Sequence, residues 1–195
     1  MAVTLNASTS TGYIQTADTS GDLALQSNGT TQFNVTSTGA YGQLKSGTAV
    51  TASGTSVDFT SIPSWVKRIT VVFNGVSTNG TSNLLLQLGD SGGIENTGYT
   101  SRSQTTGASA TSTAGFILTV SLSTSADTFN GAVFLNFLSA NTWTESAIIN
   151  HTGQNVLPYS AGSKTLSDTL DRVRITTANG TDTFDAGSIN ILYEG

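Results

Sequence analysis

The chain has 195 residues, of which 10% are charged, and a formal net charge of −5 at pH 7. This acidic balance argues against nucleic acid as a partner, because affinity for phosphate comes largely from Lys and Arg, which number seven here. The sequence has no cysteine, which excludes disulfides, zinc–thiolate sites and thiol nucleophiles.

The sequence also bears on membrane insertion and export. No apolar run reaches the roughly 20 positions that a membrane-spanning helix needs, so membrane insertion is not expected. The first residues, Met1 to Ser10, have neither the basic start nor the apolar stretch of a signal peptide. We therefore expect synthesis in the cytosol without export.

Ser, Thr, Asn and Gly fill the positions that charged residues take in an average soluble protein. These residues disfavour helix, because the polar ones compete for backbone hydrogen bonds and glycine loses more entropy on folding. Apolar residues make up 36% of the chain and occur in compact alternating runs. The sequence therefore predicts an all-β protein with one thin core.

Residues 1–47 carry small apolar clusters, Tyr13-Ile14, Leu23-Ala24-Leu25 and Phe33-Asn34-Val35, separated by Gly, Asn and Thr. Asn28-Gly29 lies between the second and third clusters and suits the two positive φ angles of a type I′ turn. This pattern predicts a β-hairpin in an otherwise extended segment. Such a hairpin is marginal alone in water, so we expect this low-complexity segment to bind another chain or another protein.

Residues 48–195 form a second predicted domain with longer, regularly alternating strands. Val57 and Phe59 share one face of the strand at 55–60, and Ile69, Val71 and Phe73 share one face of the strand at 67–76. Further strands are predicted at 83–88, 113–122, 132–138, 146–150, 172–177 and 188–193. About eight strands in about 150 residues predict an antiparallel, jelly-roll-like β-sandwich.

The C-terminal end of the chain repeats two of these signals. Asn179-Gly180 is a second dipeptide that is typical of a hairpin turn. Beyond it, Ile189, Ile191 and Tyr193 alternate with Asn190 and Leu192. We therefore expect the last strand to close a sheet.

One string could belong to a hydrolase. Gly89-Asp90-Ser91-Gly92-Gly93 matches the nucleophile string of chymotrypsin-like proteases and the Gly-x-Ser-x-Gly pattern of α/β-hydrolases. The one histidine, His151, follows the serine, which is the wrong order for the protease. The hydrolase needs a helix after the serine, and residues 93–98 are turn formers. A glycine-rich loop between strands is the favoured interpretation.

Acidic residues near the C-terminus are candidate calcium ligands. They form two pairs, Asp168 with Asp171 and Asp182 with Asp185. Neither spacing matches a dedicated calcium loop with alternating acids, so turn capping is the favoured role.

Asp127 and Glu145 could be considered as the carboxylate pair of a glycosidase. A sequence cannot show the positioned cleft that such a pair needs, so we interpret both as solvated loop acids. No catalytic residue, metal or cofactor is predicted, and the chain is expected not to be an enzyme.

Four aromatic residues are candidates for core packing or for contact with a receptor, because exposed aromatic rings offer a large rigid surface. Trp65 follows Ile62-Pro63 and is assigned to the core. Tyr99, Trp143 and Tyr159 are the candidate surface contacts. Core burial remains the favoured alternative for Trp143 and Tyr159.

Several strings resemble virion proteins of tailed bacteriophages. Within the second domain they are ASGTSVDF at 52–59, IPSWVKRIT at 62–70, FNGVS at 73–77, LDRVRITT at 170–177 and NGTDTFDAGSINILYE at 179–194. The C-terminal strings resemble the end of tail-fibre-like proteins. The shorter string QTADTSGDLALQ at 15–26 is similar to fibre segments that precede various terminal domains.

The resemblance implies a homotrimeric fibre of the virion. Its N-terminal segment, residues 1–47, would serve trimerisation and dock to tail or baseplate proteins. Its C-terminal sandwich, residues 48–195, would point outward to a glycan or protein of the host surface. The expected function is that of a short tail fibre or receptor-binding protein.

Two other functions remain open at this point. A capsid decoration or head-fibre protein would also be β-rich, acidic and oligomeric, with the capsid lattice as its partner. A polysaccharide depolymerase fits badly, because the chain is short, has one histidine and lacks a long repetitive shaft.

Overall fold

A computed structural model describes residues 23–27, 30–36, 39–41, 44–120 and 122–195. Their regular structure is entirely β-strand, and none of these residues belongs to a helix able to cross a membrane. The chain divides into two compact units, Met1–Gln43 and Leu44–Gly195. The predicted boundary, between 47 and 48, falls within the second unit, between β4 (Leu44–Ser46) and β5 (Val50–Thr51).

The first unit holds an antiparallel sheet of β1 (Leu23–Ser27), β2 (Thr30–Thr36) and β3 (Gly39–Tyr41), in that order. Ser27 pairs with Thr30, so β1 and β2 form the predicted hairpin. Asn28-Gly29 and the predicted cluster at Tyr13-Ile14 lie outside the described residues.

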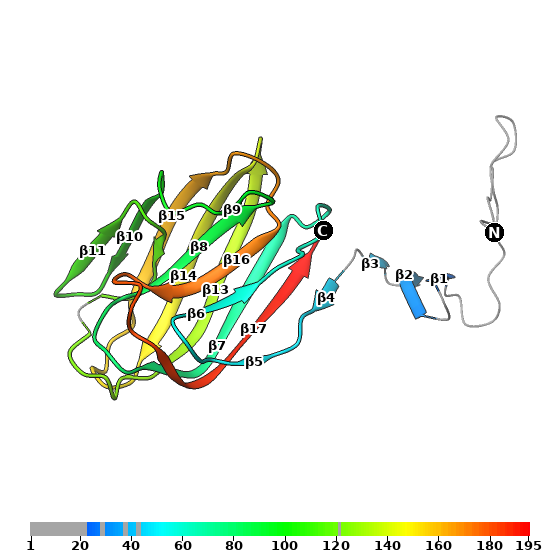
Figure 1. Ribbon diagram of the computed structural model, residues 1–195. Helices are drawn as coiled ribbons and strands as arrows, with labels where there is room; N and C mark the ends of the chain where they lie inside the picture. The colour runs from blue at the N-terminus through cyan, green and yellow to red at the C-terminus, as the bar shows by residue number, and fades with distance from the viewer. Residues whose placement is uncertain (1–22, 28–29, 37–38, 42–43, 121) are drawn as a thin grey trace, which may run out of the picture. The chain divides into compact units, whose positions relative to one another are not determined.

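The second unit is a sandwich of two antiparallel sheets (Figure 1), which confirms the predicted all-β sandwich. The larger sheet has the order β11, β10, β15, β14, β13, β7, β17, β4, and β5 also pairs with β17. Its further members are β7 (Arg68–Thr78), β10 (Thr100–Gln104), β11 (Ser109–Ser112), β13 (Phe129–Ser139), β14 (Thr142–His151), β15 (Tyr159–Thr165) and β17 (Phe184–Glu194).

The smaller sheet has the order β12, β8, β16, β6, and β9 pairs with β8. Its members are β6 (Ser56–Phe59), β8 (Leu84–Asp90), β9 (Gly93–Ile94), β12 (Phe116–Ile117) and β16 (Arg172–Thr177). The N-terminal end of β6 and the C-terminal end of β16 lie together, because Ser56 pairs with Thr176.

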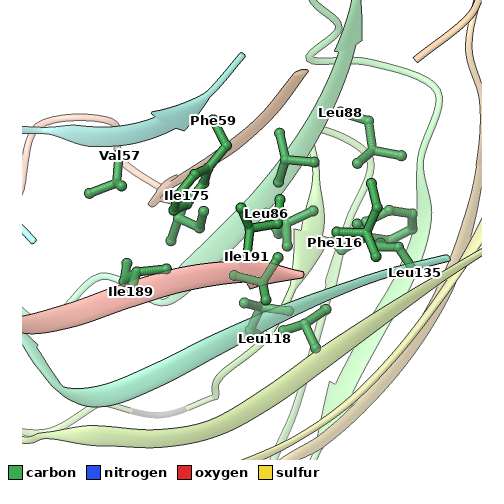
Figure 2. Close-up of a cluster of buried hydrophobic side chains, with 14 of the residues drawn as sticks. Val57, Phe59, Leu86, Leu88, Phe116, Leu118, Leu135, Ile175, Ile189 and Ile191 are labelled. Carbon is green, nitrogen blue, oxygen red and sulfur yellow. The ribbon is translucent and has the colours of Figure 1, made fainter. Parts of the chain in front are cut away.

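The core lies between the two sheets, as the alternating patterns predict. Ile69, Val71 and Phe73 of β7 are buried on one face, as predicted. The inner residues predicted for β6 and β17 are buried as well: Val57, Phe59, Ile189, Ile191 and Tyr193. Figure 2 shows Ile189 and Ile191 of β17 within this cluster. Burial of each such side chain contributes about 1.5–3 kcal/mol to folding, so the core is the main source of stability.

The second unit has more strands than the sequence predicts. Strands β10, β11 and β15 were not predicted, because Ser, Thr and Gly dominate them and leave no apolar alternation. Ser101 and Ser103 of β10 are nevertheless buried. Ser101 Oγ accepts a hydrogen bond from Ile117 N at 2.8 Å, and Ser103 Oγ donates to Leu118 O at 3.2 Å. Serines on the inner face of β10 therefore bind the backbone around β12.

The predicted hairpin at Asn179-Gly180 is wrong, because β16 and β17 belong to different sheets. The dipeptide instead forms the turn where the chain crosses between sheets. Gly180 has a φ of 69°, and Asn179 Oδ1 accepts hydrogen bonds from the backbone nitrogens of Thr181 and Asp182 at 3.0 and 3.1 Å. A turn-forming dipeptide thus fixes a turn without fixing which strands it joins.

Candidate binding surface

Ser91 lies at the tip of the tight β8–β9 turn and is exposed, as a loop residue would be. Gly92 N donates a hydrogen bond to Asp90 Oδ1 at 2.8 Å, so Asp90 closes the turn locally. Strand β9 follows directly, where a hydrolase would place a helix.

His151 is far from this serine. The turn that carries Ser91 is close to the start of β14. Ser167 Oγ donates a hydrogen bond to Asp90 Oδ2 at 2.6 Å, and Thr165, two residues before Ser167, pairs with Thr142, the first residue of β14. His151 is the last residue of β14, nine residues further on, or roughly 30 Å along an extended strand. The two residues therefore lie at opposite ends of the sandwich and do not form a catalytic pair.

A network of polar side chains joins the β8–β9 turn to β15. The ammonium group of Lys164 is buried, forms an ion pair with Glu95 and donates to Thr97 O at 2.9 Å. Burial opposes ionisation of Glu95, but hydrogen bonds from Lys164 and Ser167 outweigh it and hold the pKa of Glu95 below its ordinary value. The hydrogen bond from Ser167 likewise lowers the pKa of Asp90. These bonds fix the turn to the sandwich.

Asp127 is buried against His151, which corrects its interpretation as a solvated loop acid. Asp127 Oδ2 lies 2.6 Å from His151 Nε2, and both side chains are almost completely buried. The His151 ring also packs against Phe129, with ring centroids 5.1 Å apart. Asp127 thus ties the loop before β13 to the end of β14.

Glu145 is also buried, so its interpretation as a solvated acid is wrong as well. It lies on the inner face of β14 and accepts a hydrogen bond from Ser160 Oγ at 2.6 Å. Burial raises the pKa of Glu145 to about 7, against the effect of this hydrogen bond. Asp127 contacts His151, six residues along β14 from Glu145, so the carboxylates are roughly 20 Å apart. A glycosidase pair needs about 5–9.5 Å.

The candidate calcium ligands act within turns and strands. Asp182 accepts hydrogen bonds from Ser82 N at 2.9 Å and Asn179 Nδ2 at 2.6 Å, and Asp171 forms an ion pair with Arg172. No cluster of three or more candidate metal-ligating side chains occurs among the described residues.

The three aromatic candidates for surface contacts differ in their exposure to solvent. Tyr99 is only 2% exposed, and its hydroxyl donates to Glu95 O at 2.9 Å and accepts from Leu88 N at 2.7 Å. Trp143 is 3% exposed and packs edge-on against Phe137. Both are therefore core residues. This is the favoured interpretation for Trp143, whereas the prediction of Tyr99 as a surface contact is wrong. Tyr159 is 54% exposed, against its favoured burial, and stays a candidate contact.

Tyr159 belongs to an apolar patch on the outer face of the larger sheet. Val72, Ala132, Ile148 and Tyr159 form one row across β7, β13, β14 and β15, since each is the register partner of the next. Phe134 lies two residues further along β13, on the same face. Ile148 is 61% exposed, and a shallow hollow of about 280 Å³ lies over β13 and β14. We call these five residues the outer-face patch.

The charged side chains next to the patch are Arg68 of β7, Glu194 of β17 and Arg102 of β10, which is exposed and is the register partner of Ala161. Arg68 lies over the Phe134 ring, 5.6 Å from its centroid, and pairs with Glu194 at 3.3 Å. An open antiparallel sheet usually shows polar residues on its solvent face, so the apolar row is the feature of this unit that most needs a partner. No local pattern in the sequence indicates this row, because its residues become neighbours only through cross-strand register.

Comparison of the chain with family models, curated proteins and solved structures gave no match.

Proposed function

We propose that this chain is a structural protein of a tailed-phage virion, a short tail fibre or receptor-binding protein that acts as a homotrimer and not as an enzyme. The outer-face patch is the observation that carries the proposal, because a row of exposed apolar side chains on a sheet face suits assembly or binding. The resemblance of residues 52–77 and 170–194 to fibre proteins supports the same function, and both stretches lie in the sandwich.

The groups that could have suggested catalysis have structural roles instead. Asp90 and Glu95 hold the β8–β9 turn, and Asp127 and His151 hold each other in the core. These contacts join turns and strands of the sandwich to one another. A sandwich joined in this way suits a protein that binds by shape and by the avidity of three linked copies, each with a weak site.

The division of the chain into two units supports a division of labour. Residues 1–43 form a unit of their own, with a small sheet, and would join the chains and dock to tail or baseplate proteins. The sandwich would face the host surface and bind its glycan or protein receptor.

Labelled antibodies against the sandwich, applied to intact virions, test this proposal. We expect label at the tail tip, and we expect an excess of the purified folded protein, but not of heat-unfolded protein, to slow adsorption of the phage to its host. Label over the capsid would contradict the proposal and identify a head-fibre or decoration protein.

A further inference from the structure

We infer that the outer-face patch is the surface through which copies of this chain contact one another, so that patches from neighbouring sandwiches converge. This inference rests on the proposed function, in which the first unit brings the chains together. The patch is defined by Val72, Ala132, Phe134, Ile148 and Tyr159 on four adjacent strands of the larger sheet.

The charge of this face favours a second copy as its occupant. The chain has a net charge of −5, so two copies repel, and a face that is poor in acidic groups adds least to this repulsion. Two neighbouring rows of register partners cross β7, β13, β14 and β15 on the outer face, and all eight residues are uncharged. One row is Val72, Ala132, Ile148 and Tyr159, and the other is Thr70, Phe134, Ser146 and Ala161. The margin at Arg68 and Glu194 is neutralised by their ion pair. The basic Arg102 of β10 is exposed next to Ala161 at the β15 end of these rows. The acidic group beside the rows is Glu194, so the face is poor in acidic groups although it is bordered by arginine.

The path of the chain leads to the edge of the same sheet. Strand β4 opens the second unit, at Leu44, and pairs with β17 of the larger sheet. Strand β17 in turn pairs with β7, which carries Val72 of the patch. The second unit therefore begins at the edge of the sheet that carries the patch.

The size of the patch indicates a contact that needs this tether. Four strands span about 14 Å, and the two rows lie about 7 Å apart, so the patch is far smaller than the roughly 800 Å² per partner of a stable free interface. Tethering raises the effective concentration to about the millimolar range, where a small apolar contact closes. A contact of this area therefore depends on the first unit to hold the copies together.

Distance measurement between spin labels tests the inference, and the absence of native cysteine makes each introduced cysteine unique. Ser146→Cys, beside Phe134 on the neighbouring strand, labels the patch in the full chain. Ser91→Cys labels the exposed turn at the end of the sandwich and is the control. We expect Ser146 labels to lie closer than about 20 Å between copies, because packed sheets lie about 10 Å apart, and Ser91 labels to lie clearly farther apart.

A second variant separates a true contact from accidental proximity. Phe134→Thr combined with Ile148→Thr removes apolar surface while keeping residues that favour strands. We expect the Ser146 label distances to lengthen and broaden in this background, while the circular dichroism of the fold is unchanged. Long, broad Ser146 distances in a trimeric wild-type chain would overturn the inference but leave the proposed function intact. A monomeric full chain would overturn both.

Discussion

Glu145 is a buried carboxyl group whose ionisation opposes folding. Burial raises its pKa to about 7 in the folded chain, whereas the unfolded value is near 4.3. Folded protein therefore binds this proton more tightly, and the free energy of unfolding falls as pH rises from about 4 to about 7. Above that range this contribution is constant.

Glu145→Gln should remove this pH dependence. We expect the variant to be more stable than wild type at pH 8, by roughly 4 kcal/mol at most, and the difference to vanish near pH 4. Urea unfolding across this pH range measures it. Glu95→Gln is the control, and we expect it to lower stability at pH 8. The pKa of Glu95 is lowered in the folded chain, and removal of this carboxylate leaves Lys164 buried without its partner. Equal pH slopes for wild type and Glu145→Gln would contradict the account.

Asp127 should matter for stability through His151. Removing one member of a buried pair costs about 3–5 kcal/mol, because the other member stays buried without its partner. We expect Asp127→Ala to lose stability on this scale in urea unfolding. A double-mutant cycle with His151→Phe should give a coupling above about 0.5 kcal/mol. Additive effects would show that the two side chains are independent.

At the scale of the element, Gly187 lies in an irregular stretch of β17 and can be tested against another glycine. Its φ is 86°, and a Cβ at this position would overlap the backbone of Gly75 and Val76. Gly180 also has a positive φ, 69°, but its Cβ would meet open space. A side chain would strain the backbone at both positions, but only at Gly187 would it also overlap neighbouring atoms.

Gly180→Ala should therefore cost about 1–2 kcal/mol, from the left-handed conformation alone. Gly187→Ala should cost this amount and a further 1–3 kcal/mol or so, because the neighbouring backbone must move. Thermal unfolding of the two variants measures the difference. Equal losses would show that the contact between β17 and β7 accommodates a methyl group freely.

A strand could be predicted from the sequence where its inner face carries apolar residues, and not where it carries serines. Strand β16 was predicted with its observed bounds because Val173 and Ile175 alternate with polar residues. Strand β10 was missed because its inner residues, Ser101 and Ser103, are buried through backbone hydrogen bonds that leave no hydrophobic signal. A serine whose hydroxyl forms a hydrogen bond with the backbone of a neighbouring strand cannot be told from a loop serine in the sequence.

The candidate surface was less predictable than the strands. Tyr159 was named from its residue type, but Tyr99 and Trp143 were named on the same grounds and are core residues. The patch depends on which residues are neighbours across strands, and register between distant strands is not written in any local pattern. Val72 and Ile148 therefore became candidates only when the register was known.

For the whole molecule, the proposed function depends on association. If copies assemble as proposed, the first unit would join the chains and the apolar sheet face would be covered, which would add stability and avidity. In the proposed account, the net charge of −5 disfavours contact through acidic surfaces, and the outer-face patch is the expected contact between copies. Virion location and host attachment follow from this assembly in the proposed account.

The mass of the full chain in solution is the most direct test of this account. We expect light scattering at micromolar concentration to give three times the chain mass of 20.0 kDa. The value should hold on dilution, because the tethered contacts act together. A mass of 20.0 kDa would contradict the account, because neither the fibre function nor the contact between patches is possible for a single chain.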